Sequence, residues 1–136
     1  MTKELEEGTT LTLDFGKLTA IAEKGMRVIP VVMQDADTWE VIFVAYMNRE
    51  AFKETLRTRT AVLWSTSRNE LWLKGATSGD VLDVVEVRVN CEQNSLLILV
   101  RPRGVGSCHT RGADGQTRPT CFYRKLNATG TLEFIV

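Results

Sequence analysis

Apolar residues fall in short, β-branched runs separated by polar turns, a pattern typical of strands. Residues 28–34 and 40–47 are two such runs around a turn at 35–38, so we expect a β-hairpin. Pro30 interrupts the first run. Because proline donates no ladder hydrogen bond, an edge position or a bulge is expected there.

The same pattern continues toward the carboxyl terminus. Residues 61–65 and 71–74 flank a polar turn and predict a second strand pair. Residues 81–89 show no clean polar face, which predicts a largely buried strand. Three further strands are expected at 96–100, 122–124 and 131–136.

Helical signals are fewer than strand signals. Asn48 is a good N-cap, and Phe52 and Leu56 follow at helical spacing, which predicts the one main helix over 49–58. A short helix is also expected over 18–24.

These elements predict an α+β fold that is mostly β, in a single domain spanning residues 1–136. Residues 1–12 are polar and rich in threonine, and we expect them to form a loose arm. Hydrophobic residues make up 43% of the chain, an ordinary value for a globular protein. A core can therefore form without disulfides.

Charge and hydropathy argue against nucleic acid and membranes as partners. Seventeen basic and seventeen acidic residues give zero net charge, so no overall field attracts nucleic acid. No apolar run approaches the length of a membrane span. The first residues lack the hydrophobic segment of a secretory signal, so we expect a cytoplasmic protein with reduced thiols.

Metal-binding side chains concentrate in one quarter of the chain. Cys91, Cys108 and Cys121 are its three cysteines, and His109 is its one histidine. Three thiolates suit zinc and leave the fourth tetrahedral position free for water, as a catalytic site requires. His109 is a candidate general base, because an imidazole exchanges protons near neutral pH.

Three other interpretations remain open. The cysteines are also compatible with ordinary buried thiols, or with a disulfide, although their number is odd. They could instead close a structural zinc site with His109, but their spacing lacks the usual C-x-x-C pair. Because neighbours in an extended chain point in different directions, the sequence Cys108-His109 favours a base over a fourth ligand.

Longer motifs add to this picture. In chain order they are V-V-M-Q-D-A-D-T (31–38), A-Y-M-N-R-E-A (45–51), W-S-T-S-R-N-E-L-W-L-K-G-A-T-S-G (64–79), V-E-V-R-V-N-C (85–91), C-H-T (108–110) and C-F-Y-R (121–124). With these motifs the chain resembles the phosphoribosyl-AMP cyclohydrolases, which open the adenine ring of phosphoribosyl-AMP with water in histidine biosynthesis.

The resemblance implies an intertwined homodimer that acts on a small-molecule nucleotide. It implies zinc held by three cysteines drawn from both subunits, which match Cys91, Cys108 and Cys121, with magnesium nearby. It gives His109 the role of general base in opening the ring between N1 and C6. The family's substrate-binding signature matches Trp64, Ser65, Arg68, Trp72, Lys74, Thr77, Ser78 and Gly79.

The chain also departs from the family pattern. Asn90, Glu92 and Asn94 stand where the family's magnesium motif D-C-D-x-D has aspartates, so we expect an altered magnesium site. Ala76 replaces a glutamate, and the loop containing 111–118 is longer than usual. An alternative is therefore a diverged paralogue, either a zinc hydrolase acting on another nucleotide or a non-catalytic zinc-binding protein.

Overall fold

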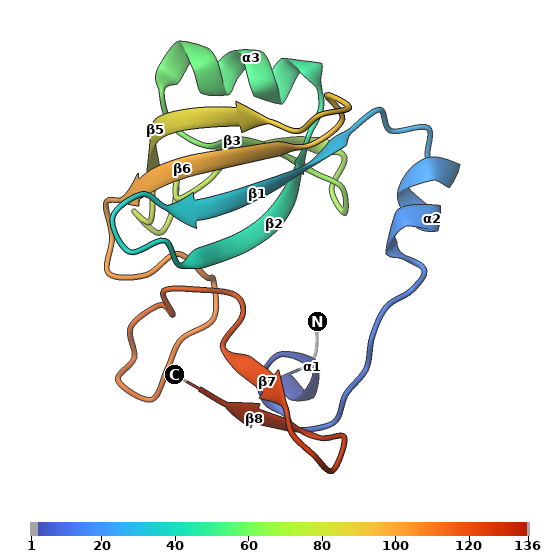
Figure 1. Ribbon diagram of the computed structural model, residues 1–136, viewed down its shortest axis with the longest axis vertical. Coiled ribbons are helices and arrows are strands. Elements are labelled where there is room, and N and C mark those ends of the chain that lie inside the picture. The colour runs from blue at the N-terminus through green and yellow to red at the C-terminus, as the bar shows by residue number, and fades with distance from the viewer. Residues whose placement is uncertain (1–2, 136) are drawn as a thin grey trace.

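A four-stranded sheet in the order β2–β1–β6–β5 is the centre of the fold (Figure 1). β1 (Ile29–Asp35) pairs antiparallel with β2 (Val41–Met47) and parallel with β6 (Leu96–Pro102). β5 (Leu82–Val89) pairs antiparallel with β6 at the other edge. The predicted hairpin over residues 28–47 is confirmed.

The computed structural model describes residues 3–135. Residues 1, 2 and 136 belong to the predicted arm and the predicted last strand, and they lie outside the described residues. Within 3–135, no helix is long and apolar enough to cross a membrane.

β1 is a central strand, but at Pro30 it pairs with β2 alone, so this residue has the predicted edge position. The ladder between β1 and β6 begins at Val31, one residue later, so no hydrogen bond to β6 needs the missing N–H of Pro30. The irregularity in β1 comes between Met33 and Gln34 instead.

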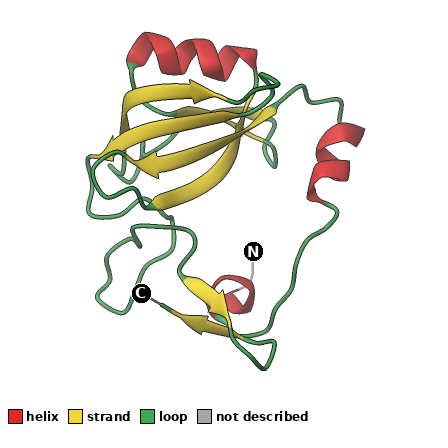
Figure 2. Ribbon diagram, in the orientation of Figure 1, coloured by secondary structure: helices red, strands yellow, loops and turns green. Residues whose placement is uncertain are grey.

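One face of the sheet is covered by α3 (Arg49–Thr58) and by the pair β3 (Val62–Ser65) and β4 (Glu70–Leu73) (Figure 2). Asn48 caps α3, and its Oδ1 accepts a hydrogen bond of 2.8 Å from the backbone N–H of Ala51. The predicted main helix and the second strand pair are both confirmed.

Apolar side chains on this covered face form the core. Each fully buried one stabilises the fold by about 1.5–3 kcal/mol relative to exposure. The largest buried side chains include Met33, Ile42, Met47, Leu63 and Ile98.

The edge strand β5 is more exposed than predicted. Its side chains Val85 and Val89 are exposed, so the prediction of a largely buried strand is wrong.

The first helix and the last strand pair lie together below the sheet (Figure 1). α1 (Lys3–Glu7) lies beside the hairpin of β7 (Arg124–Leu126) and β8 (Leu132–Phe134). A long connection that contains α2 (Lys17–Glu23) then leads up to β1. The result is a small α+β domain that is mostly β and has few helices, as predicted.

The segment predicted as a loose arm is held in place as far as residue 9. Arg124 Nη1 donates to the backbone oxygen of Gly8 at 2.9 Å, and the backbone N–H of Leu132 donates to the oxygen of Thr9 at 2.8 Å. The structure differs from the expectation because these donors come from the far end of the chain, where local composition gives no sign of them.

Thr55 provides a test of how α3 is attached to β3. Its side chain is fully buried, and its Oγ1 accepts a hydrogen bond of 3.0 Å from the backbone N–H of Val62. Thr55→Val keeps the shape but leaves that donor unpaired, so unfolding free energy should fall by about 1–3 kcal/mol. Urea denaturation measures the change. Thr55→Ser, which keeps the hydroxyl, is the control, and equal losses in the two variants would contradict this explanation.

Candidate active site

The three cysteines lie at opposite ends of the central sheet. Cys91 is exposed in the turn between β5 and β6, whereas Cys108 and Cys121 belong to the loop that follows β6. β6 has seven residues, so its ends lie about 20 Å apart. Within residues 3–135, no three histidine, cysteine or acidic side chains form a metal-binding group.

Cys108 and Cys121 are in contact with each other. The Cys121 thiol donates a hydrogen bond to Cys108 and lowers the pKa of Cys108 to about 5, with further help from Thr110. The same interaction raises the pKa of Cys121, because its proton is held between the two sulfurs. The contact therefore favours a thiolate at Cys108 and a protonated thiol at Cys121.

Backbone hydrogen bonds position this pair. The N–H of Cys108 donates to the oxygen of Arg118, and the N–H of Cys121 donates to the oxygen of Ile42, at 2.9 and 2.8 Å. The Arg118 guanidinium is 8% exposed and stacks 4.2 Å from the ring centre of Tyr123. The long loop thus folds back on itself, which brings the two sulfurs together.

Lys74 is a buried cation next to the two cysteines. Its side chain is 6% exposed, and Nζ donates to the backbone oxygen of Asp80 at 3.3 Å. Burial lowers the pKa of Lys74, while the charges of Asp80, Cys121 and Cys108 oppose this shift. Gly75 makes the intervening turn with a φ of 84°, and a Cβ there would lie 2.3 Å from the backbone of Asp80.

A cleft of about 440 Å³ opens beside Lys74. It brings together six of the side chains that the motifs suggested. A positive charge, two hydroxyls and an indole in one cleft suit a nucleotide phosphate and its base. The six are Arg68, Trp72, Lys74, Thr77, Ser78 and His109.

Three members of the suggested substrate signature lie outside that cleft. Trp64 packs against the hydrophobic core. Ser65 is buried, and its Oγ accepts a hydrogen bond of 3.2 Å from the backbone N–H of Arg68. Gly79 has a φ of 84° and donates its N–H to the oxygen of Gly75, which closes the turn before β5. In this chain, the contacts of all three residues are with the core or within turns, and they support the fold.

His109 lies between the Lys74 cleft and a second hollow of about 380 Å³ that Cys108 and Cys121 also line. Its Nε2 lies 2.5 Å from Oε2 of Glu6, and Tyr123 Oη fixes the backbone oxygen of Glu6 with a hydrogen bond. An N–H donated to Glu6 leaves Nδ1 as the basic nitrogen.

Sequence reasoning missed Glu6. It is 103 positions from His109, in a segment with no motif. It also missed Asp80, whose backbone oxygen accepts from Lys74. Asp80 directly follows the G-A-T-S-G segment, so its position could have marked it.

Comparison with known proteins shows which family the chain resembles. The model of the phosphoribosyl-AMP cyclohydrolase family matches residues 43–123. A phosphoribosyl-AMP cyclohydrolase of Hyphomonas neptunium is 45% identical over 107 residues, which are 79% of this chain and 76% of that protein. One of Archaeoglobus fulgidus is 49% identical over 104 residues, covering 76% of this chain and 88% of that protein.

This chain belongs to the phosphoribosyl-AMP cyclohydrolase family. A protein of the same name from Caulobacter vibrioides is 49% identical over 100 residues, 73% of this chain and 68% of that protein. The family consists of hydrolytic enzymes of histidine biosynthesis, so the predictions of the family and of an enzyme are confirmed.

The turn that carries Cys91 is closed by amide groups. Asn90 Oδ1 accepts hydrogen bonds of 2.9 Å from the backbone N–H groups of Asn94 and Ser95. Asn90 Nδ2 donates to Asn94 Oδ1 at 2.7 Å. Both side-chain oxygens are thus already engaged, and Glu92 supplies the only carboxylate of the three positions. One carboxylate and two engaged amide oxygens fit magnesium poorly, because magnesium prefers carboxylates, phosphates and waters in octahedral geometry.

Restoring the carboxylates should create a cation requirement in this turn. Asn90→Asp with Asn94→Asp removes the amide donor and places two like charges together. We expect measurable magnesium binding by calorimetry and a melting temperature that rises with added magnesium. The parent chain should show neither effect. Asn127→Asp, in the turn between β7 and β8, is the control for an added charge. Equal magnesium affinity in parent and double variant would overturn this account.

Proposed function

We propose that the chain hydrolyses phosphoribosyl-AMP, opening its adenine ring between N1 and C6, at zinc sites shared by two copies of the chain. The observation that carries the proposal is the arrangement around Lys74. A nucleotide-sized cleft, the Cys108–Cys121 pair and His109 lie together at one end of the sheet, and Cys91 lies at the other.

A second copy of the chain could bring a Cys91 close to Cys108 and Cys121. Two sulfurs on one zinc ion lie within about 5 Å of each other, far less than the length of β6. A twofold axis would place Cys91 of each copy against the cysteine pair of the other and so create two equal sites. The connection before β1 also exposes large apolar side chains, and Phe15 is 89% exposed. An intertwined partner would cover them.

The cysteine pair fits zinc. Two sulfurs in contact, one of them with a strongly lowered pKa, match the deprotonated soft ligands that zinc prefers. Cys108, Cys121 and the partner's Cys91 would hold the ion. Three thiolates leave one position for water, and the bound ion lowers the pKa of that water toward neutrality.

The chain's own residues would bind and orient the substrate and transfer the protons. The Lys74 cleft would hold a substrate phosphate through Lys74, Arg68 and neighbouring hydroxyls, with Trp72 available to stack on the base. His109 would take a proton from the attacking water through Nδ1, while Glu6 fixes its ring through Nε2. The oxygen of water joins C6 and the N1–C6 bond breaks, so that C6 becomes a carboxamide. One proton of the water would pass through His109 to N1, and the other would go to the exocyclic nitrogen on C6.

A second candidate is a diverged paralogue, acting on another nucleotide or binding zinc without catalysis. The amide-closed turn around Cys91 favours it, because two of the family's magnesium-binding positions carry no charge. An assay of the purified protein with phosphoribosyl-AMP and zinc distinguishes the two. Ring opening that is lost in Cys108→Ala supports the first candidate, and zinc binding without turnover supports the second.

Complementation tests the shared site. Cys91→Ala and Cys108→Ala should each lose zinc as homodimers. In a mixed dimer, one site would combine an intact Cys91 with an intact cysteine pair. After subunit exchange, about one quarter of the sites should therefore regain zinc. Metal analysis measures this, and Cys108→Ala mixed with Cys121→Ala is the control that cannot recover. No recovery in the first mixture would contradict a site built from two chains.

His109→Ala should keep zinc and lose activity by about 10²–10⁴-fold, the usual contribution of a general base. Glu6→Gln keeps the size of the side chain and should cost less, mainly in kcat, because it disturbs only the orientation of the ring. Steady-state kinetics and metal analysis check both variants. Loss of zinc from His109→Ala would instead indicate a closed structural site.

A further inference from the structure

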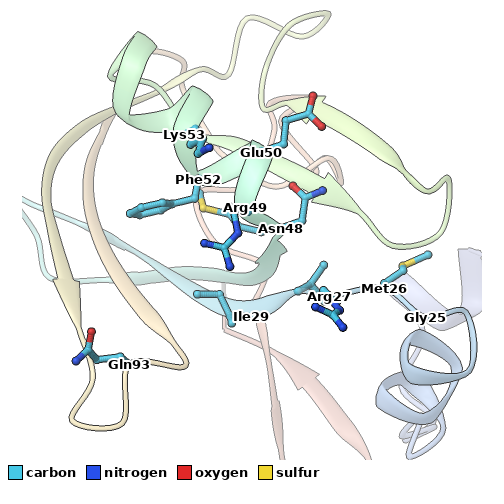
Figure 3. A pocket seen from close by; sticks show the side chains of 12 residues that line it. Gly25, Met26, Arg27, Ile29, Asn48, Arg49, Glu50, Phe52, Lys53 and Gln93 are labelled. Atoms are coloured by element: carbon cyan, nitrogen blue, oxygen red, sulfur yellow. The ribbon is translucent and has the colours of Figure 1, made fainter.

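A third hollow, of about 980 Å³, lies at the Cys91 end of the sheet, away from the two near His109 (Figure 3). It is bordered by the segment that enters β1 and by the first two turns of α3. Apolar side chains form part of its wall, among them Ile29, Met47 and Phe52. Residues 47–50 on its wall belong to the motif A-Y-M-N-R-E-A (45–51), to which no binding role was assigned from the sequence.

Three cations line this hollow. They are Arg27, Arg49 and Lys53, and within residues 3–135 none of them forms an ion pair. Figure 3 shows the Arg49 guanidinium beside Ile29, and the Glu50 carboxylate pointing away from it. The hollow is therefore lined by three cations and one acid, Glu50, and carries net positive charge.

Five of the nine exposed arginines in the described residues form ion pairs, whereas Arg27 and Arg49 do not. On the same helix, Arg57 lies 2.7 Å from Glu54, and on the sheet Arg103 lies 2.6 Å from Asp83. Arg27, Arg49 and Lys53 are exposed, so water weakens their mutual repulsion, and an anion that entered the hollow would be attracted by all three.

We infer that this hollow binds a phosphate group, and that it holds the second phosphate of the substrate. Guanidinium groups bind phosphate oxygens in pairs, and an apolar wall suits the attached sugar. The assignment to the substrate rests on the proposed function. Phosphoribosyl-AMP carries two phosphates, one on each ribose, and the Lys74 cleft offers a site for one of them.

The shared site explains how one molecule could reach both hollows. Gln93 lines this hollow and follows Cys91 by two positions, so their backbones lie within about 7 Å. When Cys91 of one copy meets Cys108 and Cys121 of the other, this hollow comes beside the partner's Lys74 cleft. Each substrate would then be held by both copies, with the reacting ring between its two phosphates.

Binding is tested first without turnover. Inorganic phosphate is titrated into the zinc-loaded protein and followed by amide chemical shifts in NMR. Amides of residues 48–53 should shift, and Arg27→Gln with Arg49→Gln should weaken that response about tenfold or more. Shifts around Lys74 should persist in the double variant. Arg57→Gln, on the same helix but outside the hollow, is the matched control. An unchanged response in the double variant overturns the site.

Kinetics then test the assignment to the substrate. The double variant should raise KM for phosphoribosyl-AMP about tenfold and leave kcat nearly unchanged, because the contact lies far from the reacting ring. Phosphate binding at residues 48–53 with an unchanged KM would overturn the assignment to the substrate. If the parent enzyme shows no turnover, the proposed function fails, and the NMR result still decides whether the phosphate site exists.

Discussion

The length of one strand governs the proposed chemistry. β6 separates the turn with Cys91 from the loop with Cys108 and Cys121 by about 20 Å, and zinc cannot bridge that distance. The strand lies in the middle of the sheet between β1 and β5, so it cannot bend without breaking two ladders. A complete three-cysteine site therefore requires association. Zinc binding and dimer formation would then stabilise each other, because each needs the same surfaces together.

The same constraint distributes the rest of the site between the two ends of the sheet. The Lys74 cleft and His109 lie with the cysteine pair, and the hollow with Arg27 and Arg49 lies with Cys91. Under the proposed function, a single copy would have two incomplete halves, and a twofold pair would have two complete sites. This arrangement suits a long substrate with a charge at each end, because neither half needs to surround it alone.

Local signals predicted what local interactions determine. The cap at Asn48 marked the start of α3, and the polar turn at 35–38 marked the β1–β2 hairpin. The cysteines and His109 were found because their chemistry is unusual in any sequence. Contacts between distant segments left no such signal. The Glu6–His109 contact and the hydrogen bonds that hold Gly8 and Thr9 depend on residues that become neighbours only in the folded chain.

The amide pair around Cys91, a proposed zinc ligand, closes its turn with neutral groups. Two aspartates at positions 90 and 94 would repel each other and would need a cation between them to hold the turn. Here Asn90 supplies the hydrogen that joins the two side chains, and its oxygen also holds the backbone of Asn94. The turn is closed by neutral groups alone. The position of Cys91 therefore depends on hydrogen bonds within its own turn.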